Sequence, residues 1–232
     1  MSKYVNSVIT TDQTGRLSNI VFGKNKFGYF LKIFKPPVNP KTTAQQNVRG
    51  FFGAASRAWA ALTTVQRSAY NSIAATMEFV KKGVPYTLTG FLLFVKLNRN
   101  LQNIGQPFYQ DISRNTLITP PDLSGSSVAI NTTPGTADIT LTLPAALDVN
   151  TMAIVYATPV LKSSRQPNWK QLRVIGTIDN TFITPGSIKT QYMAEYGVMP
   201  ATGDLVGFAV MPVNITCGLA NNKIYMDAVG AL

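Results

Sequence analysis

The sequence predicts an α+β protein: a β-hairpin and three helices come first, and an antiparallel β-sandwich of immunoglobulin or fibronectin type follows. Two observations indicate this order. Apolar residues in the first half recur at helical spacing, whereas short runs after about residue 121 alternate apolar and polar residues. With 232 residues, of which 45% are hydrophobic, the chain is long enough for one large domain or two ordinary ones. We expect a docking region over residues 1–105, a linker over 106–120 and the sandwich over 121–232.

Residues 18–35, SNIVFGKNKFGYFLKIFK, predict the β-hairpin because apolar and polar side chains alternate there. One face is expected to carry Phe27, Tyr29, Leu31 and Ile33, and the other face Phe30, Lys32 and Phe34. Gly23 and Asn25 are the expected turn residues between the two arms. The pair Gly23-Lys24 does not belong to a P-loop, since Ser18 stands where an earlier glycine is required and Asn25 replaces the magnesium-binding hydroxyl.

The stretch NPKTTAQQNVRG at 39–50 predicts the start of the first helix. Prolines exclude a helix just before it and favour an extended connection; they are Pro36, Pro37 and Pro40. Thr42 or Thr43, each followed three residues later by glutamine, fits a capping box. An apolar stripe then runs at helical spacing to about Leu62, which is the expected end of this helix.

Two further helices are expected. Thr63 and Gln66 form a second candidate capping box, so the second helix follows the first almost without a loop, as a tight αα-hairpin. Its apolar stripe is Val65, Ala69, Ile73, Met77 and Val80. Gly83 and Pro85 are expected to end it. A third helix is expected to begin near Thr89. The aromatic residues at core spacing in the helices, and therefore predicted to be buried, are Phe51, Trp59, Tyr70 and Phe79.

Short alternating runs predict the strands of the second half. These runs are 126–132, 137–143, 152–160, 170–178, 204–213 and 222–229. The Cys–Trp–Cys core of true immunoglobulin domains is missing, so only the sandwich architecture is predicted. The polar loop 162–171 carries Trp169, which either caps the end of the sandwich or anchors a partner; capping is the favoured reading.

The positive charge is concentrated in the first half of the chain. The formal net charge is +11, and residues 1–120 hold 15 of the 21 Lys and Arg residues but only 3 of the 10 acidic residues. Residues 121–232 hold the remaining 6 basic and 7 acidic residues. Such asymmetry indicates an anionic partner for the first half, or simply a solvated basic face.

The sequence predicts no enzyme. Histidine is absent, which excludes Ser-His-Asp and Cys-His catalysis and histidine-bound zinc. The single cysteine, Cys217, lies in an apolar context typical of a packed thiol, and the ten carboxylates are scattered. We therefore expect no cofactor, no metal and no small-molecule substrate. The longest apolar run, FLLFV at 91–95, is too short to cross a membrane, and the N-terminus shows no signal peptide.

The strongest candidate site is a basic docking surface. Its expected residues are Lys24, Lys26, Lys32, Lys35, Lys41, Arg49 and Arg57. Lysines that alternate with aromatic side chains are typical of surfaces that follow a phosphate backbone and stack bases. An acidic protein partner is an alternative. The third possibility is that the aromatic residues pack on the helices while the lysines are solvated.

Two sequence segments carry a resemblance to a known family. Asn39, Pro40, Lys41, Thr42, Ala44, Gln45, Gln46 and Arg49 match an NP(R/K)TxAQQxxR segment. Gly90, Phe91, Phe94 and Asn98 match a G(Y/F)NxF-like segment ending in asparagine, although Leu92 stands where asparagine is usual. With the helical pair between them, these segments resemble a family of small proteins from bacteriophages, prophages and Bacteroidetes genomes. The resemblance is close over about residues 15–100 and holds for the sandwich only in outline.

The resemblance implies a structural role in a virion, as part of the capsid, a head decoration, the neck or the tail. The chain would be made in the bacterial host cytoplasm and would assemble with other virion proteins and with copies of itself, without a membrane. Two alternatives remain from the residues themselves: a nucleic-acid-binding protein that uses the basic hairpin, and a surface adhesion module that binds through sandwich loops.

Overall fold

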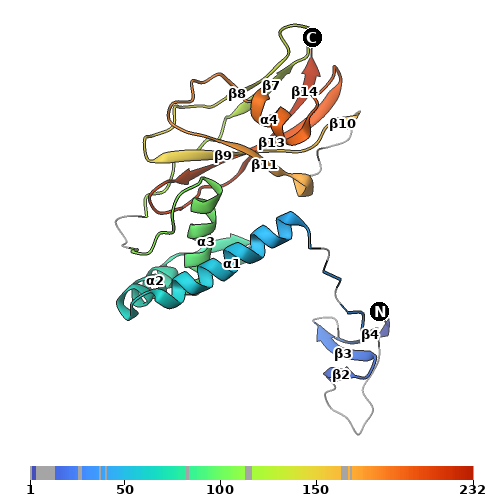
Figure 1. The fold of residues 1–232 in the computed structure, drawn as a ribbon, viewed down its shortest axis with the longest axis vertical. Coiled ribbons are helices and arrows are strands. Elements are labelled where there is room, and N and C mark those ends of the chain that lie inside the picture. Colours follow the sequence, from blue (N-terminus) through green and yellow to red (C-terminus); the bar gives the residue numbers. More distant parts are fainter. Residues whose placement is uncertain are drawn as a thin grey trace. The chain divides into compact units, whose positions relative to one another are not determined.

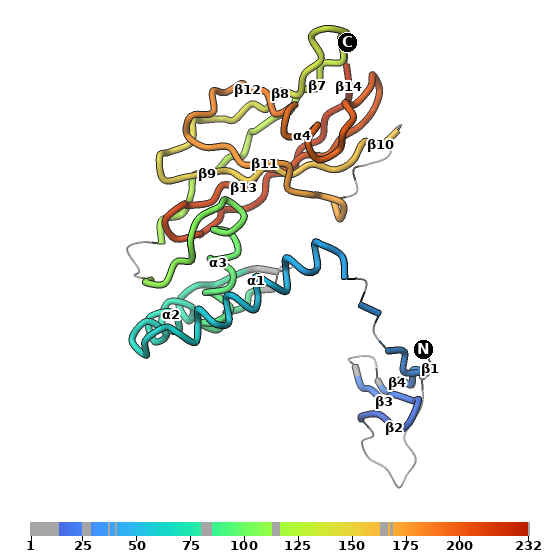
Figure 2. Tube along the Cα trace, in the orientation of Figure 1, coloured from blue at the N-terminus to red at the C-terminus, as the bar shows by residue number. Residues whose placement is uncertain are grey.

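The chain folds into two compact units, Met1–Asn47 and Val48–Leu232. The computed structural model describes residues 2–3, 14–25, 28–36, 38–39, 41–81, 84–112, 117–162, 167 and 169–231. The first unit holds a small sheet, and the second holds helices and a large curled sheet (Figure 1; the trace is in Figure 2). The α+β class is therefore confirmed. The division between units falls near the start of the first helix, whereas the sequence placed a linker at 106–120.

The small sheet is built from four antiparallel strands in the order β1-β4-β3-β2. They are β1 (Ser2–Lys3), β2 (Gly15–Leu17), β3 (Ile20–Asn25) and β4 (Gly28–Ile33). The predicted hairpin is β3–β4, but Gly23 and Asn25 are not its turn, because they pair with Phe30 and Gly28 inside the ladder. The ring of Phe30 fills the space above Gly23, which explains how a glycine is kept within a strand. Lys26 and Phe27, between the two strands, lie outside the described residues.

Three helices follow, and all three predicted starts are confirmed. They are α1 (Thr43–Ala61), α2 (Thr64–Thr76) and α3 (Gly90–Asn103). The Thr42 hydroxyl accepts the N–H of Gln45 at 3.4 Å at the start of α1. Thr63 and Gln66 form a complete capping box at α2, and Thr89 caps α3. Short polar signals were enough to place these ends because a cap depends only on its own few residues.

The aromatic residues of the helices form the predicted core. Phe51 and Tyr70 are buried, whereas Trp59 and Phe79 are half-buried and pack against the same cluster. Trp59 meets the ring of Tyr70 edge-on at 5.8 Å between centroids. Burial raises the pKa of the Tyr70 phenol, whose hydroxyl donates to the carbonyl of Tyr109 at 2.9 Å. This hydrogen bond ties α2 to the segment that follows α3.

The predicted end of the second helix is wrong. Helix α2 stops at Thr76, and the chain then forms a two-stranded antiparallel ladder of β5 (Phe79–Lys81) and β6 (Val84–Tyr86). Pro85, expected to lie beyond the helix, is paired with Val80 in this ladder. The sequence pattern predicted too long a helix because Val80 continues the apolar helical stripe. The β-branched and aromatic residues around a Lys-Gly pair, however, also suit a short hairpin.

The segment expected to be a linker packs on the helices in its described part. Phe108 meets the ring of Phe51 edge-on at 5.9 Å, and Ile112 is buried in the helical cluster. The side chain of Asn98, which is fully buried on α3, holds the backbone N–H and carbonyl of Tyr109. Phe108, Tyr109 and Ile112 are therefore part of the helical core.

Eight strands form the large sheet, in the order β11-β9-β13-β14-β7-β8-β12, with β10 paired to β13. They are β7 (Ser127–Asn131), β8 (Asp138–Thr142), β9 (Thr151–Ala157), β10 (Leu161–Lys162), β11 (Arg173–Ile178), β12 (Gly186–Ser187), β13 (Asp204–Asn214) and β14 (Ile224–Ala231). The six predicted strands are confirmed within a few residues. The pairing is not all antiparallel, because β14 and β7 run parallel. The short strands β10 and β12 were not predicted.

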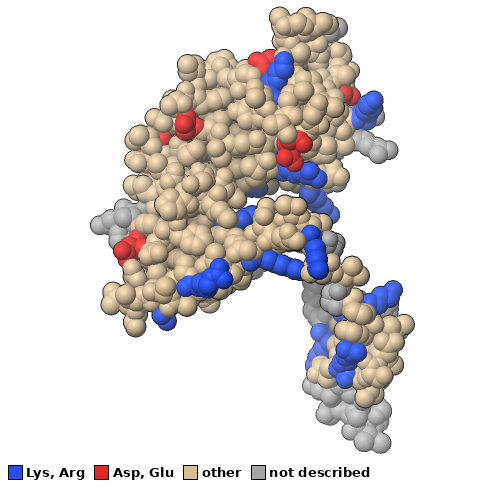
Figure 3. Space-filling model, viewed as in Figure 1, with Lys and Arg blue, Asp and Glu red and all other residues tan. Residues whose placement is uncertain are grey.

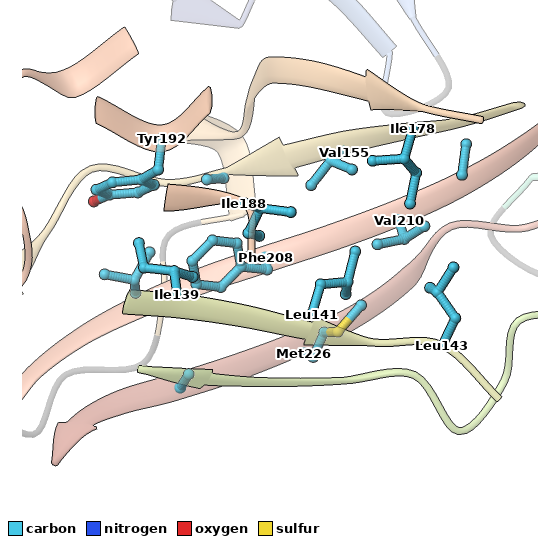
Figure 4. Close-up of a cluster of buried hydrophobic side chains, with 14 of the residues drawn as sticks. Ile139, Leu141, Leu143, Val155, Ile178, Ile188, Tyr192, Phe208, Val210 and Met226 are labelled. Atoms are coloured by element: carbon cyan, nitrogen blue, oxygen red, sulfur yellow. The ribbon is translucent and has the colours of Figure 1, made fainter. Parts of the chain in front are cut away.

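The large sheet curls around one apolar core. Side chains from β8, β9, β11, β13 and β14 point toward one another, together with Ile188 and Tyr192 at helix α4 (Lys189–Tyr196), as Figure 4 shows. A continuous curled sheet replaces the two separate sheets that the sequence predicted, so an immunoglobulin-type sandwich is not confirmed. Its outer face on β9 and β13 packs against Leu101 and Ile104 at the end of α3.

Candidate docking surface

The two faces of the small sheet differ in character. Directly opposed residues of antiparallel strands lie on the same face, and successive residues alternate between faces. One face, which we call the aliphatic face, carries Leu17, Ile20, Phe22, Leu31 and Ile33, with the pair Lys24 and Tyr29 at its end. The other, which we call the cationic face, carries Arg16, Val21, Phe30, Lys32 and Phe34. The predicted division of Tyr29, Leu31 and Ile33 from Phe30, Lys32 and Phe34 is thus confirmed.

The aliphatic face is open. Leu17 is 69% exposed, Ile33 67% and Ile20 44%. None of the residues 14–47 whose burial the structure describes is buried, so the described part of this unit has no core. A small sheet without a packed face gains little from burial and is marginal in water. Its apolar side chains would be stabilised by a partner that covers them.

On the cationic face, a cation already lies over an aromatic ring. The guanidinium carbon of Arg16 lies 3.7 Å from the centroid of the Phe34 ring, and the Arg16 Nε donates to the carbonyl of Ser18 at 2.8 Å. On the aliphatic face, the Lys24 ammonium lies 4.9 Å from the centroid of the Tyr29 ring. These contacts stabilise the strand ends and hold positive charge at the rim of the sheet.

The positive charge of this region has no acidic neighbour in sequence. Between Asp12 and Glu78 the chain contains no aspartate or glutamate, but nine lysines and arginines. Figure 3 shows Lys and Arg side chains over the small sheet and along the helices. A segment with charge of one sign attracts an oppositely charged partner and accelerates association with it.

The predicted docking residues fall in different elements. Lys24, Lys32 and Lys35 are exposed in or just after the small sheet, and Lys41, also exposed, precedes α1. Lys26 lies outside the described residues. The last two, Arg49 and Arg57, are exposed on α1 in the second unit. The structure describes the two sets separately, so it does not assemble the seven residues into one surface.

The two motifs behind the family resemblance have opposite surroundings. In the second motif, Phe94 and Asn98 are fully buried, and the Gly90 N–H donates to the side chain of Asn71 at 3.1 Å. This motif is therefore accounted for by the fold. In the first motif, every described residue from 41 to 50 is exposed. The side chains of Gln45 and Arg49 thus lie on the exposed surface of α1.

Helix α1 also contains two exposed glycines, Gly50 and Gly53, where the surroundings leave room for a side chain. A Cβ atom built on Gly50 or Gly53 would meet nothing within 4 Å. Glycine in an exposed helix interior is destabilising by roughly 0.5–1 kcal/mol relative to alanine.

We expect Gly50→Ala and Gly53→Ala each to raise the free energy of unfolding by about 0.5–1 kcal/mol, because alanine has less backbone freedom to lose. Denaturant unfolding followed by circular dichroism measures this change. The control is Ser56→Gly at an exposed position of the same helix, which should act in the opposite direction. A destabilising effect of either alanine would mean that α1 is not a regular exposed helix there.

Trp169 packs onto the large sheet. It lies in a single 3-10 turn (Trp169–Gln171), and its ring meets Tyr225 of β14 edge-on at 5.1 Å. A Cβ atom on Gly207 of β13 would come within 2.8 Å of the indole, so the glycine makes room for it. The tryptophan thus caps the outer face of the sheet, although it stays 38% exposed.

The rest of the described chain offers little chemistry. No group of three or more His, Cys, Asp or Glu side chains that could hold a metal ion occurs among the described residues. Cys217 is buried, its Sγ donates to the Asn214 side chain at 3.4 Å, and burial raises the pKa of its thiol. Within the described part of the chain, no helix is both long enough and apolar enough to span a bilayer.

Comparison with protein-family models, with curated proteins and with solved structures finds no match to this chain.

Proposed function

We propose that this chain is a structural subunit of a bacteriophage particle, in the capsid, a head decoration, the neck or the tail. Its first unit attaches it to neighbouring proteins, and its curled sheet is displayed or packs with neighbours. The resemblance of residues 15–100 to phage and prophage proteins suggests the particle. The exposed small sheet supplies the physical reason for attachment.

The single observation that carries the proposal is the lack of a core in the described part of the first unit. Its aliphatic face exposes Leu17, Ile20 and Ile33, and none of its described residues is buried. A chain that keeps such a surface in solution exposes apolar area that is normally covered by protein. Attachment to an assembly covers it, and the surrounding lysines make an acidic partner surface the favourable one.

Mass spectrometry of gradient-purified particles tests the proposal. A structural subunit is expected to be recovered with the particles in many copies, at a constant ratio to the other structural proteins across the density peak. A chain that is found in the infected-cell lysate but not in the particle peak would refute a virion role.

Nucleic-acid binding is the second candidate, and the run of positive charge between Asp12 and Glu78, which contains no aspartate or glutamate, favours it. A protein that neutralises six or more phosphates loses roughly 10³-fold or more in affinity between about 50 and 200 mM salt. Replacement of Lys24, Lys26, Lys32 and Lys35 together by glutamine is then expected to flatten this salt dependence. Fluorescence anisotropy with labelled DNA measures it.

The outcome separates the two candidates. The matched control replaces four basic residues of the second half by glutamine; they are Lys162, Lys170, Lys189 and Lys223. It should leave any salt dependence unchanged. If the unaltered protein shows no salt-sensitive DNA binding, this second function is refuted, while the virion proposal stands or falls by the particle experiment. An adhesive role through loop 162–171 has less support, since Trp169 packs on the sheet.

A further inference from the structure

One end of the curled sheet is formed by three loops that are far apart in sequence. The loops 121–126 and 143–150 adjoin the paired ends of β7 and β8, where Ser127 is opposite Thr142. The loop 179–185 leaves β11 beside the start of β9. Leu143 and Thr184 join the second and third loops: the Leu143 N–H donates to the Thr184 hydroxyl oxygen at 2.8 Å. We call the three loops together the acidic end.

The acidic end carries negative charge without any positive charge of its own. Each loop contains one aspartate: Asp122, Asp148 and Asp179. All three are exposed, and none of the three loops contains a lysine or arginine. The hydrogen bonds from the side chain and backbone of Thr181 hold the pKa of Asp179 below its usual value, so this carboxylate is ionised at neutral pH.

The acidic end also exposes aliphatic side chains. Ile183 is 83% exposed and Val149 is 65% exposed. Exposed aliphatic residues set among carboxylates mirror the aliphatic face of the small sheet, which carries Lys24 at its end, with Lys35 just after β4. The two surfaces lie on different units of the same chain. They are complementary in charge and alike in apolar character.

We infer that the aliphatic face of the small sheet docks on the acidic end of a second copy of the chain. This inference rests on the proposed role as an assembly subunit and names the partner of its attachment surface. Leu17, Ile20 and Ile33 cover Val149 and Ile183 of the neighbour. Lys24, at the end of the aliphatic face, then faces the aspartates of the acidic end, whereas Arg16 and Lys32 lie on the opposite face of the sheet.

Two other occupants fit the small sheet less well. A second small sheet would offer no acidic partner to Lys24, because the described strands β2, β3 and β4 contain no aspartate or glutamate. A single-stranded nucleic acid stacks its bases on open aromatic rings. The face in question is mostly aliphatic, and Lys24 and Arg16 already lie over Tyr29 and Phe34.

The proposed contact is heterologous: the donor and acceptor surfaces differ, so a pair of bound copies still offers one free small sheet and one free acidic end. Contacts of this type continue into rings or open chains of copies. Such a contact does not give a closed dimer in which the same surface of both copies meets itself. This distinction makes the inference testable with the purified protein alone.

Sedimentation velocity of the full chain tests it, at about 50 mM salt and at concentrations spanning about three decades around 10 µM. The weight-average mass is expected to rise with concentration beyond that of a dimer. At about 500 mM salt the association should weaken at least severalfold, because charge–charge attraction is screened. Association that stops at a dimer would overturn the inference.

Two variants test the two surfaces. The sheet variant carries Leu17→Ser and Ile33→Ser. The loop variant carries asparagine in place of Asp122, Asp148 and Asp179, so that the charge is removed while the side-chain oxygen can still accept the turn hydrogen bonds. Each variant alone is expected to remain monomeric over the whole concentration range. The matched control, Glu78→Gln with Asp227→Asn, removes exposed charge elsewhere and should associate like the unaltered chain.

Mixing the two variants gives the decisive result. The sheet variant keeps its acidic end and the loop variant keeps its small sheet, so the mixture is expected to form one-to-one pairs and nothing larger. Full association of the loop variant alone, or no pairs in the mixture although the loop variant keeps its fold by circular dichroism, would overturn the inference. So would a chain that is monomeric at every concentration, as expected if the sheet docks within its own chain or on another acidic protein.

Failure of this inference and failure of the proposed function give different results. A chain found in purified particles that stays monomeric alone keeps its virion role and loses the head-to-tail contact. A chain that associates head to tail in solution but is missing from particles keeps the contact and loses the virion role.

Discussion

Asn98→Ala is expected to lower the free energy of unfolding of the second unit by about 3 kcal/mol. The side chain is fully buried on α3. Its oxygen accepts the N–H of Tyr109 at 2.6 Å, and its nitrogen donates to the carbonyls of Phe94 at 2.9 Å and Tyr109 at 3.2 Å. Alanine removes these three bonds and leaves the half-buried Tyr109 N–H without this acceptor. Each buried polar group that is left unsatisfied costs about 1–3 kcal/mol.

Denaturant unfolding followed by circular dichroism measures this loss. The control is Gln102→Ala on the same helix, where the side chain is exposed and accepts one hydrogen bond from Arg99 at 2.6 Å. It should change the stability by no more than about 0.5 kcal/mol. An Asn98→Ala protein within about 1 kcal/mol of the unaltered chain would contradict the role of Asn98 as the clamp on Tyr109.

Local signals in the sequence predicted most of the elements. The Thr63–Gln66 capping box, the Thr89 cap and the alternation along β8 each depend on a few adjacent residues. Such signals survive in any tertiary context. The stretch after Thr76 shows their limit: one apolar run fits both a helical stripe and a strand, and pairing between Val80 and Pro85 decided for the strand.

Pairing between distant strands was not predictable in the same way. The parallel contact of β14 with β7 joins Gly230 to Ile130, a hundred residues apart, and no turn signal fixes it. Helix α4 was not predicted because its apolar residues show little helical periodicity. Tyr192 is its one fully buried residue, so no apolar stripe marks the helix in the sequence. Its left-handed Gly197 cap, with a φ of 71°, is the local signal that could have found its end.

For the candidate site, the sequence predicted residue types but not exposure. The alternation along β3 and β4 looks the same whether a hairpin is covered or open, so the openness of Leu17 and Ile33 became visible only in the structure. The acidic end could not be predicted from the sequence, for a different reason. Asp122, Asp148 and Asp179 are separated by about 30 residues each, and only the curl of the sheet brings their loops to one end.

Gly218→Ala is expected to lower the free energy of unfolding by at least about 3 kcal/mol, because two separate effects combine. Gly218 has a φ of 74°, which is unfavourable for any residue with a Cβ atom. In addition, a Cβ atom there would collide with the backbone carbonyl of Leu97 and lie 2.9 Å from the Leu101 Cγ. The Asn100 side chain also donates to the Gly218 carbonyl at 2.9 Å, so the turn after β13 is fastened directly to α3.

Gly203→Ala separates the two effects. Gly203 has a φ of 84°, similar to that of Gly218, but a Cβ atom there would meet nothing within 4 Å. This control should therefore lose only about 1 kcal/mol, from the backbone conformation alone. The difference between the two variants, measured by denaturant unfolding, is the free-energy cost of pushing the turn away from α3. Equal losses would mean that helix and sheet are not in close contact at this turn, and that α3 is free to move away from the curled sheet.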